Sequence, residues 1–118
     1  MLILNHKKLE VYSNILELVS LVYKITSAYP KSESFGLVSQ MQRASVSVMS
    51  NLAEGASRKS AVERKRFFEI SRSSLVELDS QFEISEKLEL IKNIDKGQLS
   101  SLLNIVFAQL SNLINSTK

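Results

Sequence analysis

The sequence predicts an all-α protein, an antiparallel up-down-up-down four-helix bundle in a single domain over residues 1–118. Apolar residues recur at three- and four-residue spacing in four segments, which is the pattern of a helix with one buried face. The 118 residues include three glycines and one proline, too few for the turns of an all-β chain. The segments are joined by connections of about three to six residues, and short connections favour antiparallel neighbours.

The first two helices are predicted over residues 9–28 and 34–55. In the first, the apolar stripe consists of Leu9, Tyr12, Ile15, Leu16, Val19, Val22, Tyr23 and Ile25. Pro30 should stop this helix, because proline lacks a backbone donor. In the second, the stripe consists of Leu37, Met41, Ala44, Val48 and Leu52. Gly55 is expected to end the second helix, because glycine is the usual residue just past a helix end.

The third and fourth helices are predicted over residues 60–91 and 96–115. Ser60 with Glu63 fits a capping box at a helix start, and Asp95 with Gln98 has the same spacing of capping residues. The stripe of the third helix consists of Phe67, Phe68, Ser71, Leu75, Leu78, Phe82, Ser85 and Leu88. The stripe of the fourth consists of Leu99, Leu102, Leu103, Val106, Leu110, Leu113 and Ile114. The third helix should therefore be about 45 Å long, at about 1.5 Å per residue.

The composition excludes several classes of protein. The chain has no cysteine, so disulfides, zinc sites of the Cys type and thiol nucleophiles are excluded. Its 44% hydrophobic and 23% charged residues are ordinary for a globular domain. No apolar run reaches the length of a signal-peptide core or a membrane span, so we expect a cytoplasmic protein with no membrane contact.

Catalytic and metal-binding patterns are missing from the sequence. His6 is the only histidine, and it lies in the N-terminal segment, which disfavours both a Ser-His-Asp triad and a di-iron site. The three glycines lie too far apart for a phosphate-cradling loop. The third helix carries an acidic run that we interpret as a solvated face, formed by Glu77, Asp79, Glu83, Glu86 and Glu89. We therefore expect no enzymatic activity, no cofactor and no bound metal.

The first and fourth helices carry more apolar residues than one buried face of a helix requires. Val11, Leu18 and Leu21 fall outside the first stripe, and Ile105 and Phe107 fall outside the fourth. A monomer would expose them to water, and a broad exposed apolar surface usually marks a partner interface. The sequence therefore predicts self-association.

The net charge of +3 is concentrated in one stretch between residues 54 and 72. This stretch has three anions, and it has six cations, which are Arg58, Lys59, Arg64, Lys65, Arg66 and Arg72. It includes the predicted start of the third helix, where free backbone N–H groups attract anions. The six cations are therefore candidate phosphate contacts, and several copies in an oligomer would strengthen the attraction. The alternative is a solvated helix start in which Lys65 and Arg72 each pair with Glu69.

Arg43 lies beside a stretch of small, apolar and amide side chains from residue 44 to residue 52. A charge in such surroundings needs a partner, and Glu54, Glu77 and Glu83 are the candidates. Our hypothesis is a buried or half-buried pair between Arg43 and a carboxylate of the third helix, which would fix the helix register.

Four motifs resemble a known family. They are Lys8-Leu-Glu-Val-Tyr12, Gln40-x-x-Arg43, Asn51-x-x-Glu54-Gly55 and Ser74-Leu-Val-Glu-Leu78. Over residues 7–92 the chain resembles the four-helix proteins encoded by intervening sequences of bacterial 23S ribosomal RNA genes, often labelled S23 ribosomal protein. The resemblance implies a homopentameric ring and a link to RNA or DNA. The family is similar to the basic accessory protein of diversity-generating retroelements, although this chain is only mildly basic.

Two other functions remain open at this stage. One is a scaffold that docks a partner protein, such as a reverse transcriptase, against the basic residues. The other is a helix-turn-helix regulator, with the turn at residues 53–60. A recognition helix is short and offers one face to the groove, whereas the third helix keeps a packed stripe for about 30 residues, which disfavours the regulator.

Overall fold

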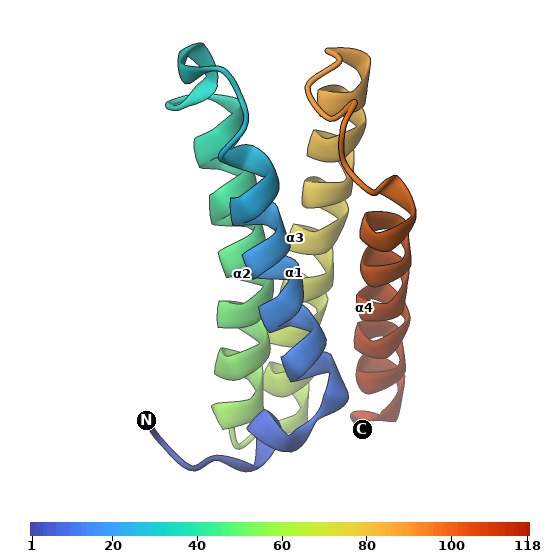
Figure 1. Ribbon diagram of the computed structural model, residues 1–118. Coiled ribbons are helices and arrows are strands. Elements are labelled where there is room, and N and C mark those ends of the chain that lie inside the picture. The colour runs from blue at the N-terminus through green and yellow to red at the C-terminus, as the bar shows by residue number, and fades with distance from the viewer.

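The computed structural model describes residues 1–118 and confirms the all-α four-helix fold. The long helices are α1 (Glu10–Thr26), α2 (Leu37–Ser57), α3 (Ala61–Lys87) and α4 (Lys96–Ser116). Two short 3₁₀ turns, η1 (Asn5–Lys8) and η2 (Lys31–Glu33), precede α1 and α2. The helices run alternately up and down, so both chain ends lie at the same end as the α2–α3 connection (Figure 1). No helix is long and apolar enough to cross a membrane.

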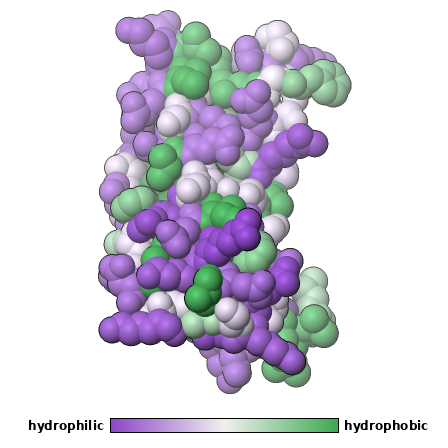
Figure 2. All heavy atoms as spheres, turned by 180° about the vertical axis from the view of Figure 1, so that it is seen from behind, coloured by the Kyte–Doolittle hydropathy of each residue, from purple (hydrophilic) through white to green (hydrophobic).

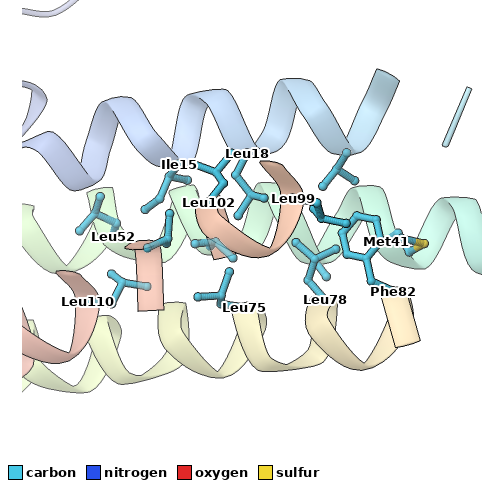
Figure 3. Close-up of a cluster of buried hydrophobic side chains, with 14 of the residues drawn as sticks. Ile15, Leu18, Met41, Leu52, Leu75, Leu78, Phe82, Leu99, Leu102 and Leu110 are labelled. Atoms are coloured by element: carbon cyan, nitrogen blue, oxygen red, sulfur yellow. The ribbon is translucent and has the colours of Figure 1, made fainter. Parts of the chain in front are cut away.

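A single hydrophobic core runs along the inside of the bundle. All four helices contribute side chains that meet between the ribbons, among them Ile15, Leu18, Met41, Leu52, Leu75, Leu78, Phe82, Leu99, Leu102 and Leu110 (Figure 3). The predicted stripes of α2, α3 and α4 supply most of this core. Both predicted N-caps are also present, because Ser60 accepts the N–H of Glu63 at 3.3 Å and Asp95 accepts that of Gln98 at 3.0 Å.

The buried face of α1 differs from the predicted stripe. Leu16 and Tyr23 are exposed, whereas Val11 and Leu18, expected outside the stripe, are buried. The core positions of α1 alternate spacings of four and three residues, and they are Val11, Ile15, Leu18, Val22 and Ile25. The helix carries two overlapping apolar stripes, and the one with the regular seven-residue repeat packs against the neighbours.

Gly55 does not end α2, which continues to Ser57. The glycine lies at a close contact between α2 and α3, and a Cβ atom placed on it would be 2.8 Å from Cε1 of Phe68 and 3.0 Å from Cβ of Phe67. The position therefore requires glycine for close packing, and its φ is not positive.

The third helix ends at Lys87, four residues earlier than predicted. Glu89 adopts a left-handed backbone conformation with φ of 62°. The N–H of Leu90 then bonds the carbonyl of Ser85 at 2.9 Å, and the N–H of Glu89 bonds that of Glu86 at 3.0 Å. This is the hydrogen-bond pattern of a Schellman motif, which normally has glycine at the left-handed position. The turn it makes buries Ile91 in the core.

Replacing Glu89 with glycine is expected to stabilise the protein. A left-handed conformation costs a residue with a Cβ atom about 1 kcal/mol, and glycine avoids this cost. Glu89→Ala is the matched control, because it also removes the exposed ion pair with Lys92 but keeps the Cβ atom. In urea unfolding, Glu89→Gly should exceed Glu89→Ala by about 1 kcal/mol. Equal stabilities of the two variants would contradict this account of the turn.

Candidate nucleic-acid interface

The up-and-down topology collects positive charge at one end of the bundle. The α2–α3 connection, the N-terminal segment and the C-terminus all lie there (Figure 1). We call this region the basic end, and its cations are Lys7, Lys8, Arg58, Lys59, Arg64, Lys65, Arg66 and Lys118. Its carboxylates are those of Glu10, Glu54 and Glu63. The basic end thus carries a formal charge of +5 and the rest of the chain −2, in accord with the total of +3.

Three cations of the basic end were missing from the predicted set. Lys7, Lys8 and Lys118 are far in sequence from residues 54–72, and only the topology brings them close. The N-terminal segment lies against the lower part of α2, where Lys7 borders a shallow hollow together with Glu54 and Phe67. An up-down-up-down order by itself places the first and last residues beside the α2–α3 connection. The predicted fold therefore already implied that cations near the two chain ends would lie close to those of residues 54–72.

Arg58 and Arg64 hold the α2–α3 connection in place. Arg58 pairs with Glu54, with 3.2 Å between Nη2 and Oε1, and its guanidinium lies 4.9 Å from the ring centre of Phe67. Arg64 donates from Nη1 to the carbonyl oxygens of Lys59 at 2.6 Å and Arg58 at 3.2 Å. These contacts satisfy carbonyl groups just beyond the end of α2. Both side chains are half-buried, so their first role is to shape the loop that carries the other cations.

Lys59, Lys65 and Arg66 are the free cations of the predicted set. All three are exposed, and their side chains form no hydrogen bond or ion pair within the chain. The alternative pairing of Lys65 with Glu69 is absent. The three cations flank the N-terminus of α3, where the helix dipole adds a partial positive charge. Their chemistry suits phosphate groups, which need charge and donors but no shaped pocket.

Arg72 and Arg43 lie elsewhere than predicted. Arg72 leaves the basic end and contacts α4: its Nη1 donates to Oγ of Ser111 at 3.0 Å, and its guanidinium lies 5.7 Å from the ring centre of Phe107. Arg43 is exposed and forms no ion pair, so the expected buried pair with Glu54 or a carboxylate of α3 is not formed.

Small hydroxyl groups connect α2 and α3 where an ion pair was expected. Oγ of Ser71 donates to the carbonyl of Val48 at 2.6 Å, and Oγ of Ser47 and Ser74 are 2.8 Å apart. Serine allows the helices to approach closely, whereas an arginine pair would need more room. Glu77 and Glu83, the carboxylates of α3 proposed for that pair, are both exposed.

Two features outside the basic end concern metal ligands and buried titratable groups. No three or more acidic or histidine side chains are arranged to hold a metal ion. Tyr29 lies in the core, where burial raises the pKa of its hydroxyl above its ordinary value, an effect that Ser85 partly offsets.

The comparisons with known proteins agree with the fold. The family model for the 23S rRNA-intervening sequence protein matches residues 7–112, which span the last residues of the N-terminal segment and nearly all of the four helices. No curated protein matches the sequence. The match covers most of the chain, and the protein belongs to the 23S rRNA-intervening sequence protein family.

Proposed function

We propose that this protein is a non-enzymatic, cytoplasmic homo-oligomer that binds RNA or DNA through the basic end. The supporting observation is that Lys59, Lys65 and Arg66 are exposed and unpaired at an end with a formal charge of +5. Arg58 and Arg64 keep the connecting loop in shape. Contacts of this kind neutralise phosphates and do not read bases, so the binding is independent of sequence.

Self-association is supported by apolar side chains that remain in contact with water. Leu16 and Tyr23 of α1 and Ile105 and Phe107 of α4 are each more than two-fifths exposed. An oligomer would cover part of this surface. A cyclic assembly, pentameric by the resemblance to the family, would also place several basic ends on one rim. Phosphate binding grows steeply with the number of contacts, so a modest charge on each copy becomes effective.

A titration of fluorescent nucleic acids at several salt concentrations tests this function. We expect an RNA hairpin and a DNA duplex of unrelated sequence to bind with similar affinity, and to lose most of it between about 50 and 200 mM salt. Affinity that is insensitive to salt, or confined to one sequence, would contradict the proposal.

The same basic end would also suit an acidic surface of a partner protein, such as a reverse transcriptase. In that case the titration shows no nucleic-acid binding at either salt concentration. The helix-turn-helix alternative is disfavoured by the structure, since α3 is 27 residues long and packs a stripe that includes Phe68, Leu75 and Leu78 into the core, whereas a recognition helix is short.

A further inference from the structure

We propose that the apolar segment of residues 1–4 of one copy inserts into a groove between α3 and α4 of a neighbouring copy. We call this segment the N-terminal arm. The inference rests on the self-association included in the proposed function and names the two surfaces that meet.

The N-terminal arm is apolar and lies outside the core. Its residues are Met1, Leu2, Ile3 and Leu4, of which Ile3 is 97% exposed and Leu2 73%. Seen from behind, hydrophobic atoms project at the lower right, the corner at which the chain begins (Figure 2). Four consecutive apolar residues in water favour burial against another surface.

The groove between α3 and α4 has an apolar floor and a length that fits the arm. Leu75, Phe82 and Leu99 line it, and its volume is about 340 Å³. Val76 and Phe107 border it and are 50% and 43% exposed. Along α3 it extends from Leu75 to Glu86, about 16 Å at the helical rise of about 1.5 Å per residue. Four extended residues span at most about 14 Å.

The charges around the groove complement those beside the arm. Asp79, Glu83 and Glu86 line the α3 side of the groove. Glu86 is held by a lysine of α4 at 2.9 Å, whereas Asp79 and Glu83 have no ion-pair partner in the chain. The arm is followed within four residues by Lys7 and Lys8. Lys8 has no partner in the chain, whereas Nζ of Lys7 donates to the carbonyl of Leu2 at 2.6 Å. An arm lying in the groove would therefore bring Lys8, and Lys7 once it releases this carbonyl, toward two free carboxylates.

The arm is too short to fill the groove of its own chain. It leads into η1 at Asn5, and Leu2 and Leu4 line the hollow beside Phe67 at the lower end of the bundle, which they would leave on insertion into a groove. Along α3, Val76 is about 13 Å above Phe67 and Glu86 about 28 Å above it. Counted from Asn5 in η1, the four residues of the arm extend over at most about 14 Å, so in its own chain the arm would reach only the lower edge of the groove. The occupant is therefore a second copy, in a head-to-tail contact that closes into a ring or continues as a filament.

Cysteine cross-linking tests this contact, because the chain has no cysteine of its own. Full-length Ile3→Cys is mixed with size-tagged Asn104→Cys, whose cysteine lies at the groove, and the mixture is oxidised. The control replaces the second protein with Val46→Cys, which is exposed on α2 far from the groove. We expect the mixed disulfide at least about fivefold more often with Asn104→Cys than with Val46→Cys. Equal yields, or no disulfide with Asn104→Cys, would overturn the inference.

A second pair of variants tests the charge complementarity without touching the core. Asp79→Lys with Glu83→Lys, added to the Asn104→Cys protein, should lower the yield several-fold, and an unchanged yield counts against the contact. The nucleic-acid titration separates this inference from the proposed function. Nucleic-acid binding without the cross-link overturns only the arm contact, whereas the cross-link without nucleic-acid binding supports the contact and contradicts the nucleic-acid function.

Discussion

Reversing the charge of Lys65 and Arg66 together is expected to weaken RNA binding about a hundredfold at about 50 mM salt. Both side chains are exposed and form no hydrogen bond or ion pair within the chain, so Lys65→Glu with Arg66→Glu should leave the fold intact. Each cation that contacts a phosphate releases counterions worth about a tenfold gain in affinity at this salt concentration. Removing two such contacts therefore accounts for the expected loss, and fluorescence anisotropy with a labelled hairpin measures it.

The matched control for this prediction is Lys24→Glu with Lys31→Glu. Both lysines are exposed and unpaired, and they lie toward the opposite end of the bundle. The control changes the net charge by the same amount, so any difference between the two double variants is due to position. We expect the control to lose less than about tenfold in affinity. Equal losses in both variants would show that total charge, and not the basic end, governs binding.

Replacing Gly55 with alanine is expected to lower the free energy of unfolding by about 1–3 kcal/mol. The added Cβ atom would be 2.8 Å from Cε1 and 2.9 Å from Cδ1 of Phe68, so α2 and α3 would have to separate. In an open helix position the same change stabilises by about 0.5–1 kcal/mol, so the two explanations of this glycine predict opposite signs. Urea unfolding at one protein concentration distinguishes them.

A second substitution shows whether the clash is the cause. Phe68→Leu removes the ring atoms nearest to Gly55 and is destabilising by itself, because Phe68 is buried. In the double variant, alanine at position 55 should cost at least about 1 kcal/mol less than it does in the original protein. Additive effects would mean that the ring of Phe68 is not the obstacle, and would leave Cβ of Phe67, 3.0 Å from the added atom, as the contact that requires glycine.

The number and type of the helices were predictable because local signals agreed with each other. Ser60 and Asp95 marked two helix starts, and Pro30 marked an end close to the observed one. The face of α1 was not predictable in the same way, since Leu16 and Leu18 both satisfy helical spacing. Only packing against α2 and α4 decides between them.

Helix ends near close contacts were harder to predict than helix starts. In the sequence, Gly55 cannot be distinguished from a glycine that ends a helix. In the structure, its lack of a side chain instead allows the close contact with Phe68. The residue type at position 89 does not predict a helix end, because a left-handed conformation is unfavourable for glutamate. The burial of Ile91 after the turn holds Glu89 in this conformation. Both cases depend on tertiary contacts that periodicity does not contain.

The candidate site was predictable in part for a similar reason. The charge excess at residues 54–72 was visible in the sequence. The sequence did not show which of these cations bond within the chain and which face water. Arg64 turns back to the α2–α3 loop and Arg72 turns to α4, whereas Lys65 and Arg66 face water. Spacing along a helix gives the direction of a side chain but not the presence of a carbonyl or hydroxyl group within its reach.

The salt dependence of RNA affinity, compared between the original protein and the Lys65→Glu with Arg66→Glu variant, tests the central claim most directly. If the basic end binds phosphates, the logarithm of affinity falls steeply with the logarithm of salt concentration in the original protein. The slope of the variant should be shallower by about one unit for each cation lost. Equal slopes in the two proteins would contradict the assignment of the basic end as the nucleic-acid interface.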